Sequence, residues 1–413
     1  MNNASPSRKS PALPFTFCAR ALGVVLLLGC SFVNGCSPSG NSSFTGLGHL
    51  PDGTNSYAGA VSVDGKVIVG ESDSASGLQA FRWTAADGMV GLGFLPGGTT
   101  SWTRAVSSNG SVIVGESYSA TGRQPFRWTV ASGMVGLGHL PGATTYGHLA
   151  YGSAEHISKD GLVVVGQSDS SSGLQAFLWT AEHGMVGIGF LPDEHKDNEG
   201  SVVSTEKSGP VIRLTSIERK QSKAFGVSAD GSVIVGESGS PTLGSQAFRW
   251  TKANGMAALR SLPHESTNTC ARAVSANGSV IVGWCWNEWD AGVEAYRWTA
   301  ASGIVQLGKL PGRTRSMAYA VSNDGEVVVG NSFGFGPEEA FIWDSLNGMR
   351  SLKTVLIKDY NLDLASWVLH CACDISSDRK TIIGNGKHNG HNEAWIAHLD
   401  RPLNAPAGKV GGK

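Results

Sequence analysis

Hydrophobic and polar positions alternate along this chain in a unit that returns until the chain ends. The unit is clearest at Ala60–Trp83, where short apolar segments flank the dipeptide Asp64-Gly65. The same turn recurs at Asn109-Gly110, Asp160-Gly161, Asp230-Gly231, Asn277-Gly278 and Asp324-Gly325, with a weaker copy at Asp378-Arg379. We therefore count seven repeat units, numbered one to seven in chain order.

Each unit predicts four short strands, because β-branched residues gather in segments bounded by turn residues. In unit one the expected strands are Ala60–Ser62, Val67–Gly70, Ala80–Trp83 and Met89–Gly93. Glycine in Asp64-Gly65 and in Asp87-Gly88 would supply the positive φ of tight turns. Each unit is thus expected to form a four-stranded antiparallel meander.

Aromatic residues repeat on the third expected strand of units one to six. Phe or Tyr is followed two residues later by Trp, in the pairs Phe81/Trp83, Phe126/Trp128, Phe177/Trp179, Phe248/Trp250, Tyr296/Trp298 and Phe341/Trp343. Residues two apart share one face of a strand. We expect these aromatics to pack between neighbouring sheets.

The spacing of the units and their two ends predict a β-propeller. Pro51, Pro96 and Pro141 repeat at about 45 residues, which suits four strands per blade. The region opens with a lone fourth-type segment, Gly46–Leu50, and closes with a third-type segment, Glu393–Leu399, that lacks a fourth. The predicted fold is therefore all-β: a seven-bladed β-propeller of four-stranded antiparallel blades, with the ring closed by the N-terminal strand.

The N-terminus is typical of an export signal, expected over residues 1–30 with cleavage as late as residue 35. Basic residues precede the apolar run Ala21–Leu28, which is too short to span a bilayer. Cys30 in LLGC and Cys36 in VNGC both resemble the lipid-modified cysteine of a bacterial lipobox, and a plainly cleaved signal is the alternative. A polar linker (31–45), the propeller (46–400) and a flexible C-terminal tail (401–413) are expected to follow.

Charge and cysteine content narrow the chemistry. A formal net charge of -1 gives no global signal for nucleic acid. Cys270 and Cys285 are equidistant from the Asn277-Gly278 turn, so a two-residue hairpin would set them opposite each other and allow a disulfide. Cys371 and Cys373 would lie about 7 Å apart on a regular strand, too far to bond without distortion. Four buried thiols are the alternative.

The repeated Gln-Ala-Phe, Glu-Ala-Phe and Val-Ser-x-Asp-Gly elements resemble the bacterial extracellular HAF-repeat family. The resemblance covers residues 46 to about 400 in pattern, although Gln or Glu stands where the family has His, and Pro125 replaces one alanine. It implies an exported repeat protein with no established catalytic residues.

In a meander the tight turns share one end of the sheet, so the longer connections at the other end form the candidate working face. There, unit five carries Trp284, Trp286, Trp289 and Asp290, and unit six carries Phe333 and Phe335. Rings beside carboxylates suit sugars, although Trp284 and Trp286 could instead pack inward. The same face bears a long charged insertion, Asp193–Lys223, which is either a binding flap or a floppy segment.

Two histidines of unit seven, His388 and His391, fall on this face, but spacing fixes no third ligand and we expect neither metal nor cofactor. The sequence thus predicts an exported, lipid-anchored monomer, or a secreted one, that binds a glycan or an envelope protein at the bacterial cell envelope without catalysis. It would bind no nucleic acid and would reach the membrane only through its anchor. One alternative is an envelope polysaccharide or cell-wall hydrolase or lyase that uses Glu288 and Asp290 with the histidines of unit seven. The other alternative is a structural scaffold.

Overall fold

The computed structural model describes residues 42–143, 149–192, 220–240, 244–259, 268–287 and 292–404. Regular structure in these ranges consists of β-strands and a single α-helix, α1 (Leu352–Tyr360). The all-β class expected from the sequence is confirmed. The export signal, the lipobox cysteines Cys30 and Cys36, most of the unit-four insertion and the tail beyond Asn404 lie outside the described residues.

The strands follow the sequence units in order. Units one to three contain β2 (Ser56–Val61), β3 (Ile68–Ser74), β4 (Gly77–Thr84) and β5 (Gly88–Gly91); β6 (Ser101–Val106), β7 (Val112–Ser119), β8 (Gly122–Thr129) and β9 (Gly133–Gly136); and β10 (Ala150–Ile157), β11 (Val164–Ser170), β12 (Gly173–Thr180) and β13 (Gly184–Gly187). Units four and five contain β14 (Lys220–Val227), β15 (Val233–Ser240), β16 (Gly244–Thr251) and β17 (Gly255–Ala258); and β18 (Asn268–Val274), β19 (Val280–Asn287), β20 (Gly292–Thr299) and β21 (Gly303–Gln306). Unit six contains β22 (Arg315–Val321), β23 (Val327–Gly334), β24 (Gly336–Asp344) and β25 (Gly348–Ser351), and unit seven contains β26 (Trp367–Ile375), β27 (Thr381–His388) and β28 (His391–His398), with β1 (Ser43–Gly46) at its edge.

The sheets are antiparallel meanders within each unit, as predicted. Units one, five and six each form a separate four-stranded sheet. Units two to four are joined into one twelve-stranded sheet by short parallel contacts, β8 with β10 and β12 with β14, each covering two residue pairs. These contacts arise because the first strand of one unit starts beside the hairpin end of the preceding unit's third strand.

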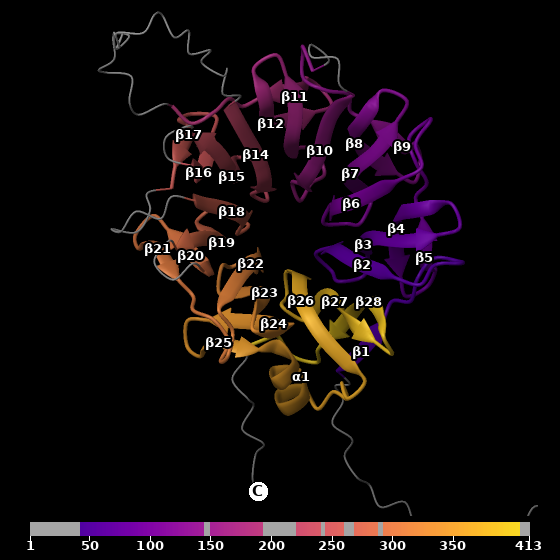
Figure 1. Ribbon diagram of the computed structural model, residues 1–413, viewed down its shortest axis with the longest axis vertical. Helices are drawn as coiled ribbons and strands as arrows, with labels where there is room; N and C mark the ends of the chain where they lie inside the picture. The colour runs from indigo at the N-terminus through magenta and orange to yellow at the C-terminus, as the bar shows by residue number, and fades with distance from the viewer. Residues whose placement is uncertain are drawn as a thin grey trace, which may run out of the picture. The chain divides into compact units, whose positions relative to one another are not determined.

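The two ends of the described chain meet in one sheet with the order β1-β28-β27-β26 (Figure 1). Strand β1 pairs antiparallel with β28, from Ser43 opposite His398 to Gly46 opposite Trp395. The strand expected at Gly46–Leu50 therefore begins three residues earlier and ends four residues earlier than predicted. Phe44 on β1 stacks on Trp395 with ring centroids 5.4 Å apart and meets Trp367 edge-on at 5.2 Å.

The repeated aromatics form the core, as expected. Phe81, Phe126, Phe177, Phe248, Tyr296 and Phe341 are fully buried, and Trp395 occupies the same place in unit seven. The tryptophans two residues later pack against the same core clusters, several of which combine residues of neighbouring units. Packing between units thus comes from the strand pattern itself.

Each unit's first strand carries a β-bulge at the same place, five residues before the turn Asp or Asn. The extra residues are Gly59, Arg104, Glu155, Phe225, Arg272, Tyr319 and Cys373. A bulge leaves one residue without a cross-strand partner and reverses the faces of the residues beyond it. The repeated bulge therefore decides which side chains of the first strands face inward.

The turns after these strands are longer than predicted. In unit one Ser62 N donates to Val67 O, which leaves a four-residue loop, and Asp64 accepts from the Ser62 hydroxyl at 2.7 Å. Backbone bonds also link successive turns, for example Ser108 N to Lys159 O at 3.0 Å. Ser377 N of unit seven donates to Val63 O of unit one at 3.3 Å.

The predicted disulfide between Cys270 and Cys285 is wrong. The four cysteines in the described part of the chain are free thiols. The bulge at Arg272 shifts the register by one residue, so Cys270 lies opposite Trp284 and Cys285 lies opposite Thr269. Adjacent positions of a strand face opposite sides, and the two sulfurs therefore point apart.

Candidate functional site

The first strands of all the units line one cavity of about 410 Å³. Its wall is built from residues of β2, β6, β10, β14, β18, β22 and β26, with a few from second strands and from the turns. Every bulge residue is in this wall. The cavity is therefore the place where one variable position of each repeat unit comes together.

The side chains that the bulges present differ from unit to unit: glycine, two arginines, glutamate, phenylalanine, tyrosine and cysteine. Their neighbours are more uniform, since alanine precedes the bulge in units one and three to seven. The sequence therefore contained an indication of this site: one position of the first strand varies between units, whereas the rest of the strand is repetitive. Sequence reasoning missed it because strand alternation alone does not show a bulge.

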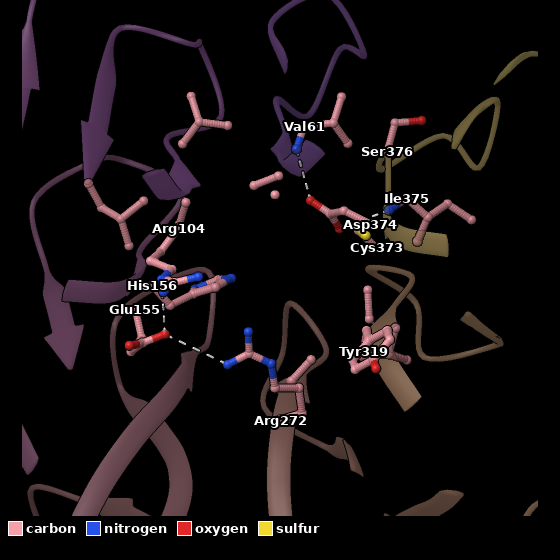
Figure 2. Close-up of a pocket in the computed structure, with 18 of the residues that line it drawn as sticks. Val61, Arg104, Glu155, His156, Arg272, Tyr319, Cys373, Asp374, Ile375 and Ser376 are labelled. Atoms are coloured by element: carbon pink, nitrogen blue, oxygen red, sulfur yellow. Dashed lines mark hydrogen bonds and ion pairs between the residues drawn. The ribbon is translucent and has the colours of Figure 1, made fainter. Parts of the chain in front are cut away.

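Glu155 stands between two cations in the cavity wall (Figure 2). Its Oε2 atom lies 4.0 Å from Arg104 Nε and 3.8 Å from Arg272 Nη1. Its other oxygen accepts hydrogen bonds from the Ser153 hydroxyl at 2.7 Å and Gln167 Nε2 at 3.1 Å. Glu155 is thus held in place, while neither arginine forms a direct hydrogen bond to it.

A second carboxylate, that of Glu116 on the neighbouring strand β7, also pairs with Arg104. Glu116, fully buried on β7, accepts a hydrogen bond from Arg104 Nη2 at 2.6 Å and pairs with Arg123 through the same oxygen. Arg123 also lies over the Trp102 ring, 4.4 Å from its centroid. Charged groups in a buried layer need such partners, and here they fix the guanidinium that faces the cavity.

Two acids in the wall hold their protons unusually well. Burial raises the pKa of Asp374 to about 6, although its oxygens accept hydrogen bonds from Val61 N at 3.0 Å and Ile375 N at 2.8 Å. Burial also raises the pKa of Glu71 to about 7; nearby Arg104 opposes this and Glu116 adds to it. Both acids therefore change charge near neutral pH.

A neutral base and two aromatic rings complete the wall. Burial and the Arg272 charge lower the pKa of His156 to about 4, and its Nδ1 atom has no hydrogen-bond partner among the described residues. Arg272 lies over the Phe225 ring, 5.3 Å from its centroid. Burial raises the pKa of Tyr319. The cavity thus combines apolar rings with hydrogen-bond donors and acceptors.

The described part of the chain contains no group of three or more His, Cys, Asp or Glu residues suited to a metal ion. His388 instead bonds to Glu393, with Nδ1 2.8 Å from Oε2, and stacks on Trp367 with centroids 4.3 Å apart. His391 is exposed. The two unit-seven histidines thus have different surroundings.

The aromatic residues chosen from the sequence lie elsewhere. Trp284 and Phe333 are half-buried, and Trp286 and Phe335 are 38% and 82% exposed. None of these four residues is in the cavity wall. Trp289 and Asp290, together with Glu288, lie outside the described residues. Whether the aromatic residues bind a ligand stays a prediction.

Several serines of the connections considered for binding are structural. Ser72 in unit one is fully buried; its hydroxyl accepts from Leu50 N at 3.0 Å and donates to Asn55 O at 2.9 Å. Ser117 and Ser168 make the matching contact in units two and three. The next residue, Asp73, accepts from the backbone N–H groups of Thr54 and Asn55, both at 2.7 Å.

No family model and no curated protein matches this chain. Among similar solved structures, oligogalacturonate lyase from Vibrio parahaemolyticus has a TM-score of 0.52 at 9% identity, covering 87% of this chain and 97% of that chain. The β-propeller domain of the Trilobed protease from Pyrococcus furiosus has a TM-score of 0.47 at 9% identity, covering 87% and 98%. TolB from Acinetobacter baumannii has a TM-score of 0.40 at 12% identity; 71% of this chain is covered, and only 61% of TolB.

At such identities the likeness shows the fold alone. With repeated antiparallel sheets around one cavity, it makes this chain a protein of the β-propeller class. The resemblance to the HAF-repeat family stays a prediction. Within the ranges that the structure describes, no helix has the length and apolar character needed to cross a bilayer.

Proposed function

We propose that this protein is an exported, lipid-anchored, seven-bladed β-propeller that binds a small saccharide in its central cavity at the bacterial cell envelope. The observation that carries the proposal is the set of bulge residues, which brings charged and aromatic side chains of different units into one cavity. The likeness to HAF repeats and the lipobox-like cysteines Cys30 and Cys36 support export and anchoring.

Contacts between the first and last units support a closed ring of blades. Strand β1 adds a fourth strand to unit seven, and Asn385 of β27 accepts a hydrogen bond from Ala58 N of β2 at 2.7 Å. If these contacts join the last of seven repeat units to the first, the units form a closed propeller that leaves no long open sheet edge.

The chemistry of the wall suits a sugar. Phe225 and Tyr319 offer apolar surface for the faces of a pyranose ring, whereas Glu155 and Asp374 can accept hydrogen bonds from hydroxyl groups. Arg104 and Arg272 can donate to hydroxyl oxygens or to the carboxylate of a uronic acid. A cavity of about 410 Å³ has the size of a small-molecule pocket rather than of a polymer groove.

Calorimetric titration of the purified protein with neutral and uronic mono- and disaccharides tests the proposal. We expect saturable binding that weakens about tenfold or more in Glu155→Gln, since this removes the charge held between the two arginines. Glu182→Gln, at an exposed carboxylate with 84% of its side-chain surface accessible, is the matched control and should bind like the unchanged protein.

The same titrations on Trp286→Ala and Phe335→Ala examine the exposed aromatic residues. If those variants lose binding while Glu155→Gln keeps it, the ligand binds at the aromatic residues and the cavity proposal fails. A folded protein that binds no saccharide in the panel would argue for an envelope protein as partner.

A second function, cleavage of an envelope polysaccharide, is favoured by one observation. Glu71 and Asp374, whose pKa values are raised to about 7 and about 6, line the same cavity and could transfer protons near neutral pH. Chromatography after incubation of the protein with bacterial envelope polysaccharides would reveal shortened products, and Asp374→Asn should then abolish turnover while saccharide binding persists. Polysaccharides that stay intact in every mixture would dismiss this second function.

A further inference from the structure

The first strand of unit seven brings two thiols together. Cys371 and Cys373 flank one alanine, and on a regular strand they would lie about 7 Å apart. Strand β26 instead carries two bulges, between Leu369 and Cys371 and between Ala372 and Asp374. These bulges supply the distortion that sequence reasoning judged necessary, and the two Sγ atoms lie 3.3 Å apart.

Both thiols lie in the cavity wall, half-buried. Asn385 on β27 donates from Nδ2 to Cys373 Sγ at 3.2 Å, and its Oδ1 atom accepts from Ala58 N at 2.7 Å. The amide is thus fixed by unit one and in turn fixes the Cys373 sulfur beside Cys371. Tyr319, from unit six, lies in the same wall.

The two sulfurs differ in acidity. The hydrogen bond with Cys373 lowers the pKa of Cys371, whereas the same contact and burial raise the pKa of Cys373. Cys371 therefore ionises first, and a thiolate, not a thiol, is the nucleophile in sulfur chemistry.

The other two described cysteines differ from this pair. Cys270 and Cys285 are buried, burial raises the pKa of each, and neither lies in the cavity wall. Such thiols are inert packing groups. The chain therefore contains its own matched controls.

We propose that Cys371 and Cys373 form a thiol–disulfide exchange site that takes a small organic disulfide in the cavity. The Cys371 thiolate attacks one sulfur of the disulfide, which forms a mixed disulfide and releases one thiol. Cys373, once deprotonated, attacks the Cys371 sulfur and releases the second thiol. One disulfide is reduced to two thiols while the protein pair is oxidised to a disulfide, and the exchange runs equally in reverse. The inference does not depend on saccharide binding.

The test uses the purified full chain with Cys18, Cys30 and Cys36 replaced by serine, so that the four described cysteines alone remain. It is reduced, freed of reductant and mixed with bis(2-hydroxyethyl) disulfide as the probe. We expect release of two equivalents of mercaptoethanol and an intact mass lower by two hydrogens. Cys371→Ser should release no thiol above the protein-free mixture. Cys373→Ser should stop at the mixed disulfide and carry one mercaptoethanol adduct on Cys371, located by peptide mass spectrometry.

The double variant Cys270→Ser, Cys285→Ser should react like the unchanged protein. The Cys373→Ser adduct keeps the test decisive even if Cys371→Ser folds poorly. The proposal is overturned if the unchanged protein keeps both thiols, or if it accumulates a stable mixed disulfide, since the second thiol would then not resolve the first. Saccharide titration of the oxidised and the reduced protein tests the proposed saccharide binding independently of the thiol exchange.

Discussion

Glu71 shows how one half-buried carboxyl in the cavity wall links the stability of the protein to pH. Burial raises its pKa to about 7, from a usual value near 4.5. Between these pH values the folded protein keeps a proton that the unfolded chain has lost, so stability falls as pH rises through this window. Above about pH 7 the full cost of the buried charge is present.

We therefore expect Glu71→Gln to be more stable than the unchanged protein at about pH 8, by on the order of 2 kcal/mol. The difference should shrink as pH falls toward about 4.5, where Glu71 is protonated in both states. Urea unfolding of both proteins at several pH values measures this. Asp374 and His156 titrate in both proteins and cancel in the comparison; a difference that does not change with pH would rule the explanation out.

The sequence shows which residue types occupy the cavity positions, but it does not show to which face of the strand their side chains point. Arg104, Glu155 and Arg272 each stand five residues before a turn Asp or Asn. Strict alternation assigns each residue a face, and a bulge reverses that assignment within the strand. The same reversal separates Cys270 from Cys285 and draws Cys371 toward Cys373. No local residue pattern signalled it.

At the scale of the element, serine hydroxyls hold the first strand of one unit to the unit before it. Ser101 on β6 is fully buried, accepts from Ala80 N at 2.9 Å and donates to Gly93 O at 2.7 Å. Ser56, Ser222 and Ser316 make the same pair of bonds in other units. These serine bonds therefore link neighbouring units whether the units form separate sheets or share one.

Ser101→Ala should cost about 1–3 kcal/mol, since it leaves the buried Ala80 N–H and the partly buried Gly93 carbonyl without their hydroxyl partner. Ser76→Ala, at an exposed hairpin position, is the control and should change stability by less than about 0.5 kcal/mol. Thermal melting of both variants beside the unchanged protein provides the measurement. Equal melting temperatures for the two variants would mean that the inter-unit bond contributes nothing.

Elements with strong local patterns were predictable, whereas one helix was overlooked. The strands follow β-branched segments and the turns follow Asp-Gly, as expected. Helix α1 also has a sequence signature: buried Leu352, Val355, Leu356 and Tyr360 recur at helical spacing after the N-cap Ser351. The helix was missed because the repeat pattern was assumed to continue through the connection between units six and seven. This connection departs from the pattern.

At the scale of the whole molecule, the repeat count and the pairing of the two ends follow from the sequence with little structural input. A lone segment at the start and a missing one at the end predict that the first strand joins the last sheet, and β1 pairs with β28. The cavity, in contrast, forms only when the first strands of all the units come together, and the bulges that turn its variable residues inward were not predicted from the sequence.

The contact between the first and last units can be tested with two glycines that share a backbone conformation. Gly65 and Gly88 both have positive φ, 72° and 67°. A Cβ on Gly65 would lie 2.2 Å from Thr381 Oγ1 of unit seven, whereas one on Gly88 would meet nothing within 4 Å. Alanine therefore costs backbone strain at both positions, about 1–2 kcal/mol, and a collision at Gly65 alone.

We expect Gly65→Ala to destabilise the protein more than Gly88→Ala, and part of the excess to disappear in the Thr381→Ala background. A double-mutant cycle by chemical unfolding should give a coupling of about 1–2 kcal/mol between positions 65 and 381, and none between 88 and 381. Additive effects at 65 and 381 would mean that unit one does not pack on unit seven. Coupling confined to this pair would show that two segments over 300 residues apart in sequence depend on each other, as a closed ring of blades requires and an open array of repeats does not.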